Sequence, residues 1–142
     1  MATLKIGIDA SSTLAPRTGV GRAALGMLRG LVELQDPAVE LRVAMTSLTR
    51  SPGPEHAFLT EANVPVHRRR SPGHWLVKKW AAGGGLTAEE LVGPGIDVFH
   101  APGAYVPPSD GARRVASVYD VAFLDDPPAA RDKLGGALFA DW

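Results

Sequence analysis

The chain has 142 residues, of which 45% are hydrophobic, and its 15 basic side chains balance its 15 acidic ones. This length and composition fit one globular domain with a buried core, so we expect residues 1–142 to form a single domain. Zero net charge argues against a general affinity for nucleic acid, and the absence of cysteine excludes disulfides, thiolate metal sites and cysteine nucleophiles. No apolar run approaches the roughly 20 residues of a membrane helix, and no signal-peptide pattern is present. We therefore expect a cytoplasmic protein.

The first 45 residues have the pattern of a strand, a helix and a second strand. Residues 4–9 form a short β-favouring run, which a loop containing Pro16 follows. Apolar residues then recur every three or four positions over 20–34, which predicts an amphipathic helix. Residues 39–45 alternate apolar and polar side chains, which is typical of a strand. Two strands joined by a helix predict a parallel pair and thus the beginning of a doubly wound sheet.

The rest of the chain supplies shorter elements. Residues 63–67 favour a short strand, 74–82 a helix, and 87–90 resemble a capping box. Residues 96–100 and 114–120 are apolar runs, which we interpret as two buried central strands. The expected fold class is therefore α/β, a Rossmann-like, doubly wound and mostly parallel sheet with helices on both faces.

Polar residues follow three of these strands. Ligands of open parallel sheets bind outside the carboxyl ends of the strands, so the residues at those ends are candidates for a site. Here they are residues 9–22, residues 100–102 and the pair Tyr119-Asp120. We expect these segments to converge on one site, and the alternative is that they are ordinary polar strand ends.

The segment Thr18-Gly19-Val20-Gly21-Arg22 stands at the expected start of the first helix. Glycines there let backbone amides approach an anion, and the helix N-terminus adds partial positive charge, so the segment predicts a phosphate site. It also matches the dinucleotide pattern G-x-G-x-x-G/A, but the long preceding loop and the lack of an acidic residue after the second strand argue against a nicotinamide or flavin nucleotide. The alternative is that both glycines only permit a turn and close helix packing.

Basic and aromatic residues gather in the middle of the chain. Residues 67–70 read His-Arg-Arg-Arg, and two tryptophans and two lysines follow within 75–80. The overall charge balance argues against nucleic acid here, so we expect a solvated loop, while a peripheral contact with anionic lipid or a phosphorylated acceptor stays open. His56, His67 and His74 lack ligand-like spacing, and we expect no metal site.

Four motifs occur in chain order: Ile8-Asp9-Ala10, Thr18-Gly19-Val20-Gly21-Arg22, Asp97-Val98-Phe99-His100-Ala101-Pro102 and Val118-Tyr119-Asp120-Val121-Ala122-Phe123-Leu124. Together they resemble the amino-terminal domain of glycosyltransferase family 4. The resemblance covers residues 5–128, without a detailed match over 50–94. It implies the GT-B architecture of two Rossmann-like domains across a cleft. It also implies sugar transfer from a nucleotide-sugar donor with retention of configuration, without a metal or other cofactor.

The resemblance also implies roles for single residues. The expected donor-phosphate residues are Gly19, Val20, Gly21 and Arg22. The expected residues of the acceptor cleft are Asp9, Arg17, His100 and Pro102. The expected catalytic residues are Tyr119 and Asp120. The family typically has His-Asp at this last pair, and a phenol donates a hydrogen bond without carrying positive charge.

The chain ends at Trp142, before the last elements of this domain and the whole carboxyl-terminal, donor-binding domain of the family. We therefore expect the acceptor-side part of a hexosyltransferase-like enzyme, inactive alone, whose partners are a nucleotide-sugar donor and a sugar or lipid acceptor, in the cytoplasm or at the inner face of the membrane. The alternative is a noncatalytic module that binds a phosphate or a glycan. An unfinished sheet would leave an open edge, which favours self-association.

Overall fold

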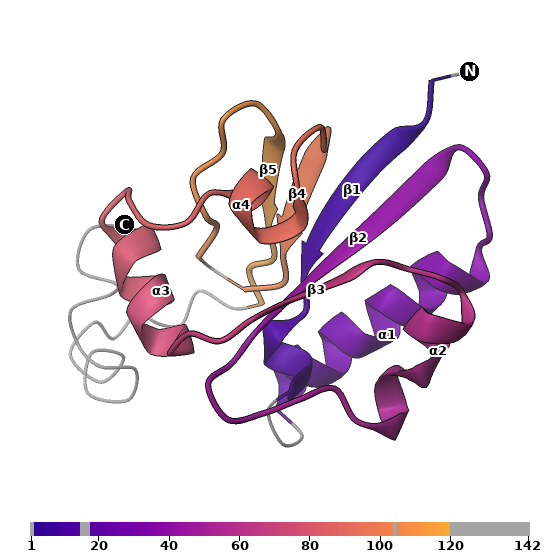
Figure 1. Ribbon diagram of the computed structural model, residues 1–142, viewed down its shortest axis with the longest axis horizontal. Coiled ribbons are helices and arrows are strands. Elements are labelled where there is room, and N and C mark those ends of the chain that lie inside the picture. Colours follow the sequence, from indigo (N-terminus) through magenta and orange to yellow (C-terminus); the bar gives the residue numbers. More distant parts are fainter. Residues whose placement is uncertain (1, 15–17, 104, 120–142) are drawn as a thin grey trace.

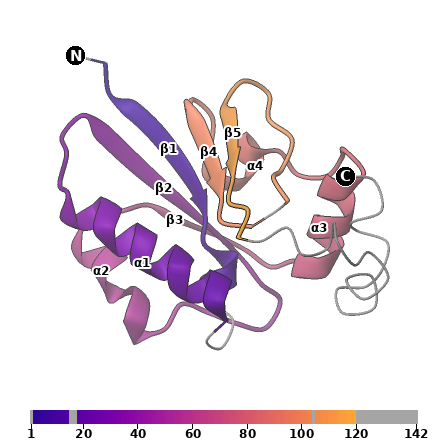
Figure 2. The same cartoon turned by 180° about the vertical axis from the view of Figure 1, so that it is seen from behind.

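The computed structural model describes residues 2–14, 18–103 and 105–119. These residues form a five-stranded sheet in the order β3-β2-β1-β4-β5, in which every neighbouring pair is parallel. Helices cover both faces of this sheet, as the opposite views in Figure 1 and Figure 2 show. The α/β, Rossmann-like class that the sequence predicts is confirmed.

The strand order puts the first strand of the chain in the middle of the sheet. β1 (Leu4–Asp9) lies between β2 (Val39–Thr46) and β4 (Val98–Ala101). The edges are β3 (Val66–Arg69) and β5 (Arg113–Ala116). The predicted parallel pairing of the first two strands is therefore confirmed, and the predicted third strand begins later than expected.

The expectation that the last strand is a buried central one is wrong. Among the strands of the described residues, β5 lies at the edge of the sheet, and all four of its residues are exposed. It is also shorter than predicted, because strand structure ends at Ala116 and the described residues up to Tyr119 continue without it. The apolar residues of this run suggested burial, but Arg113 and Arg114 at its start suit an open edge, where charged side chains remain in water.

Two helices pack on each face of the sheet. α1 (Gly19–Glu33) and α2 (Ala57–Glu61) cover one face, and α3 (Gly73–Ala81) and α4 (Ala88–Val92) cover the other (Figure 2). Two 3-10 helices, η1 (Ser11–Leu14) and η2 (Pro54–His56), precede α1 and α2. The sequence did not predict η1, η2 or α2. Within the described residues, no helix is long and apolar enough to cross a bilayer.

The core consists of one apolar cluster on each face. Ile8, Leu28 and Val43 belong to the cluster beneath α1, whereas Phe99 and Val92 belong to the cluster beneath α3 and α4. The alternation of side chains along β1 and β4 explains this division, because neighbouring residues of a strand face opposite sides of the sheet.

β1 also needs a glycine at its centre. A β-carbon added at Gly7 would lie 2.8 Å from Phe99 and 2.8 Å from Val92, closer than real β-carbons approach other atoms. The absence of a side chain therefore lets the second core cluster pack directly onto the middle of the sheet.

The loop before β5 is held by one carboxylate. Glu89 of α4 accepts hydrogen bonds from the Ser109 hydroxyl (2.7 Å) and from the backbone N–H groups of Asp110 (3.0 Å), Gly111 (3.2 Å) and Ala112 (3.1 Å). Burial acts to raise the pKa of Glu89, but these hydrogen bonds outweigh it and lower the pKa to about 2. The amino end of β5 is thus fixed to α4 by an ionised side chain.

Candidate functional site

The candidate site lies at the carboxyl edge of the sheet, where the strand order reverses. From β1 the chain builds outward to β2 and β3, then returns to the other side of β1 for β4 and β5. Such a switch point separates the loops that follow the two central strands and leaves room for a ligand. Ile8 pairs with His100, so the ends of β1 and β4 lie side by side there.

Asp9, the last residue of β1, organises the loop that follows it. Its Oδ1 accepts hydrogen bonds from the N–H (2.9 Å) and the hydroxyl of Ser11. The Ser11 hydroxyl oxygen in turn accepts the Thr46 N–H at 2.9 Å, which ties the end of β1 to the end of β2. Burial raises the pKa of Asp9, and the hydrogen bonds from Ser11 oppose the rise. The carboxyl group therefore acts first as a support of the η1 segment.

The two glycines at the start of α1 do different things. Thr18 caps the helix and its hydroxyl oxygen accepts the Gly21 N–H at 3.0 Å. A β-carbon added at Gly21 would lie 2.6 Å from the Ser12 carbonyl oxygen, whereas one added at Gly19 would meet nothing within 4 Å. Gly21 therefore serves close packing, and its amide donates to the cap residue in this structure; the role expected for it on a diphosphate stays a prediction.

The first turn of α1 still offers donors to an anion. The first N–H groups of any helix lack partners within the helix, and here those of Gly19 and Val20 precede the capped one. Arg22 is exposed one residue beyond Gly21. Beside this turn, Ser12 carries a buried hydroxyl that has no hydrogen-bond partner among the described residues. No sequence pattern indicates this unpaired hydroxyl.

On the other side of the switch point, His100 forms a pair with Ser117. Its Nε2 lies 2.9 Å from the Ser117 hydroxyl oxygen, and the Ser117 N–H continues the ladder to the Ala101 carbonyl oxygen at 3.2 Å. Burial lowers the pKa of His100, which favours the neutral form of the ring. Sequence reasoning selected the histidine and missed the serine, because the strand register alone brings them together.

The remaining expected residues are distributed as follows. Pro102 is buried directly after β4, and Tyr119 is 53% exposed beyond the end of β5. Arg17 and Asp120 lie outside the described residues. Asp9 and His100 therefore lie at the ends of neighbouring strands, and the start of α1 follows the loop after Asp9.

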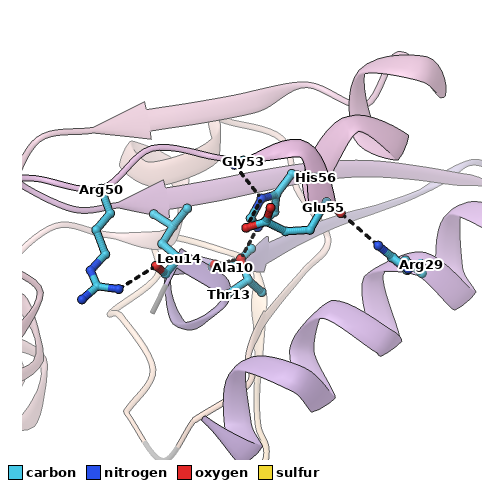
Figure 3. A network of polar contacts seen from close by, with 8 residues as sticks. All are labelled: Ala10, Thr13, Leu14, Arg29, Arg50, Gly53, Glu55 and His56. Atoms are coloured by element: carbon cyan, nitrogen blue, oxygen red, sulfur yellow. Dashed lines mark hydrogen bonds and ion pairs between the residues drawn. The ribbon is translucent and has the colours of Figure 1, made fainter. Parts of the chain in front are cut away.

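His56, for which the sequence predicts no role, stabilises the loops at the same edge through hydrogen bonds (Figure 3). His56 is 3% exposed, and its Nδ1 accepts the Gly53 N–H at 3.1 Å. Its Nε2 must then carry the proton and donate it to the Thr13 hydroxyl oxygen, 2.9 Å away. The Thr13 hydroxyl donates to the Ala10 carbonyl oxygen at 2.6 Å. Each polar group in this series of hydrogen bonds has a partner, so both ring nitrogens of His56 are satisfied.

Two arginines extend this connection, as Figure 3 shows. Arg50 donates to the Leu14 carbonyl oxygen and Arg29 of α1 donates to the Glu55 carbonyl oxygen, each at 3.2 Å. The loop after β2 is thus attached to both η1 and α1. The segment that leads into the capped helix start is held from one side by Asp9 and Ser11, and from the other by His56.

Hydrogen-bond donors and neutral polar groups dominate this edge, which suits an anion or a polyol. In the described ranges, no three or more His, Cys, Asp or Glu side chains are grouped so as to hold a metal ion. Comparison with protein-family models, curated proteins and solved structures returns no match.

Proposed function

We propose that the chain is the acceptor-side, amino-terminal part of a retaining GT-B glycosyltransferase of family 4. Such an enzyme transfers a sugar from a nucleotide-sugar donor to a glycan, lipid or small-molecule acceptor. The observation that supports this most is spatial: Asp9, Thr18 and His100, from three of the four motifs, lie at the carboxyl ends of neighbouring strands or at the helix start beside them. Tyr119, from the fourth motif, follows the strand next to β4.

The start of α1 is the proposed contact for the donor diphosphate. Sugar transfer leaves negative charge on the departing diphosphate, and fixed donors aimed at that charge stabilise the transition state. The amides of Gly19 and Val20, the partial positive charge of the helix end and the Arg22 guanidinium would supply such donors.

The His100–Ser117 pair and Tyr119 are proposed to face the acceptor and the transferred sugar. A neutral imidazole, a hydroxyl and a phenol exchange hydrogen bonds with sugar hydroxyls and impose no net charge. Tyr119 and Asp120 stand where the family has its catalytic His-Asp pair, so we assign them the catalytic position.

A noncatalytic phosphate- or glycan-binding module is the second candidate. The observation that favours it is that Thr18 already uses the Gly21 amide, while a neutral phenol replaces an imidazole at Tyr119. The first removes a hydrogen-bond donor and the second a group able to carry positive charge from the site of a departing diphosphate, and both leave a binding surface intact.

Transfer by the complete translation product tests the proposal. We would read the coding DNA past the Trp142 codon, express the whole open frame and assay it with a panel of nucleotide sugars. We expect donor-dependent transfer that Arg22→Ala reduces at least about tenfold, equivalent to loss of one charge-assisted contact. Arg29→Ala, on the same helix but bonded to Glu55, is the matched control and should retain activity.

The outcomes separate the two candidates. Transfer that rises further with Tyr119→His would support the assignment of that position. Binding of nucleotide or glycan without transfer from any donor would favour the noncatalytic module. A folded product that neither binds nor transfers would overturn both.

A further inference from the structure

The charge of this chain is unevenly distributed. Residues 62–86 contain five lysine or arginine side chains, two histidines and no acidic residue. The remainder of the chain holds the other 10 basic and all 15 acidic residues, so it carries a formal charge of −5. The neutral total therefore hides one strongly basic segment.

Most of this charge is exposed to solvent along β3, the turn that follows it and α3. We use the name basic-aromatic surface for Arg69, Arg70, His74, Trp75, Lys78 and Lys79, all of which are exposed. Arg69 donates to the Glu90 carbonyl oxygen of α4, on the face of the sheet that α3 and α4 cover, whereas its neighbour Arg68 donates to the Ser51 hydroxyl oxygen on the other face and is left out of this surface. Within the described part of the chain, none of the six forms an ion pair with a carboxylate.

The helix that bears this surface has two distinct faces. Leu76 and Trp80 of α3 pack into the core, whereas Trp75, Lys78 and Lys79 point away from it. Trp75 is 49% exposed, and the Lys79 Nζ lies 4.6 Å from the centroid of its ring. α3 lies on the face of the sheet opposite to α1 and α2 (Figure 1). A large aromatic ring is thus offered to solvent together with cations.

We propose that the basic-aromatic surface binds anionic lipid bilayers. A bilayer with anionic headgroups attracts lysine and arginine, and tryptophan is favoured at the boundary between headgroups and hydrocarbon. The surface combines both features on one short amphipathic helix and the strand end before it. This inference does not depend on glycosyl transfer.

The same residues fit single-stranded nucleic acid less well. Sequence-tolerant binding of that kind uses several aromatic rings along a basic groove, on which successive bases stack. Trp75 is the one tryptophan, tyrosine or phenylalanine of the basic-aromatic surface. A single ring surrounded by cations suits the flat surface of a bilayer better than it suits an extended single-stranded nucleic acid.

Flotation of the purified chain with vesicles tests this inference. We expect binding to phosphatidylcholine vesicles that contain phosphatidylglycerol, and none to phosphatidylcholine alone. Each basic residue near an anionic surface strengthens binding about fivefold, so Lys78→Gln with Lys79→Gln should weaken it about 30-fold. Trp75→Ala should also weaken it, and added salt should release the protein because exposed charges are screened.

A control with the same change of net charge distinguishes a local surface from general attraction. Arg29→Gln removes one exposed cation from α1, on the opposite face of the sheet, and should leave vesicle binding within about twofold, whereas Lys78→Gln alone should weaken it about fivefold. Thermal unfolding of each variant establishes that it is folded.

Three results would overturn the proposal. The first is failure of the folded chain to float with anionic vesicles. The second is an equal loss of binding in Arg29→Gln and Lys78→Gln. The third is binding to a single-stranded RNA oligomer in place of vesicles, which would identify the surface as a nucleic-acid contact.

Discussion

Two histidines at the carboxyl edge of the sheet make the same contact in different surroundings. His56 and His100 each place Nε2 at 2.9 Å from a hydroxyl oxygen, that of Thr13 and that of Ser117. His56 is almost fully buried and its second nitrogen accepts the Gly53 N–H. His100 is half-buried and pairs with a serine that follows an exposed edge strand.

The two halves of the carboxyl edge therefore have different roles. Around the ends of β1 and β2, polar groups of η1, the loop after β2 and η2 form hydrogen bonds with one another and hold the segment that leads into α1. Around β4 and β5, the amino end is held by Glu89, while the carboxyl end carries an exposed phenol and a half-buried imidazole. The same residue type is therefore structural in one half and a candidate ligand contact in the other.

The largest effect should come from His56→Ala. The change removes the acceptor of the Gly53 N–H and the donor to Thr13, and it leaves a cavity, so we expect a loss of about 3 kcal/mol in unfolding free energy. Chemical denaturation measures this. His56→Asn retains an acceptor near Nδ1 and should lose less. The exposed His74→Ala should change stability by no more than about 0.5 kcal/mol, and equal losses at the two positions would contradict a supporting role for His56.

The next effect should come from Gly21→Ala. Its β-carbon would collide with the Ser12 carbonyl oxygen, so we expect destabilisation of about 1–3 kcal/mol although alanine favours helix. Gly26→Ala lies in the same helix with nothing within 4 Å and should stabilise the protein by up to about 1 kcal/mol. Changes of opposite sign in the melting temperature of the two variants would support the packing role of Gly21. An unchanged melting temperature for Gly21→Ala would show that η1 moves to accommodate the added methyl group.

A smaller, pH-dependent effect is expected from Glu89→Gln. The folded-state pKa of Glu89 is lowered from 4.5 to about 2, so its contribution is present above the unfolded value and disappears as the pH falls toward 2. Because the carboxylate is partly exposed, we expect a loss of about 1 kcal/mol at neutral pH. The variant and the parent should converge in acid denaturation curves. Glu61 is exposed on α2, so Glu61→Gln should leave the unfolding free energy unchanged at neutral pH, and its acid denaturation curve should follow that of the parent throughout.

The smallest effect concerns His100. Burial lowers its pKa, so the unfolded chain binds a proton more readily and stability should fall as the pH drops through about 6.5. His100→Gln should reduce this dependence of stability on pH. The change in unfolding free energy should be less than about 1 kcal/mol, because the ring is half exposed. NMR titration of the ring checks the direction of the shift. A ring that titrates above 6.5 would mean that a negative charge outweighs its burial.

The long periodic segments could be predicted from sequence, and the short ones could not. β1, α1 and β2 have apolar patterns that extend over six residues or more, and their positions are confirmed. η2 and α2 follow Pro54 in segments too short to show a period. The apolar run at 114–120 predicts an interior strand, because such a run does not reveal whether another strand pairs with its far side.

The candidate edge was predicted in outline because strand ends converge in any parallel sheet. The partners of its residues depend on distances that sequence does not contain. Gly21 contacts Ser12 only because η1 folds back on the helix start, and His56 reaches Thr13 across 43 positions. The roles expected for Arg17 and Asp120 fall outside the described residues and stay predictions.

The central position of β1 has a consequence for synthesis. One side of β1 can pair as soon as β2 leaves the ribosome. The other side pairs with β4, which is synthesised roughly 50 residues later. At about 5–20 residues per second this side stays unpaired for roughly 3–10 s. Bare strand edges recruit other strands. The nascent chain should therefore be most vulnerable to aggregation, and most in need of chaperones, between the emergence of β2 and that of β4.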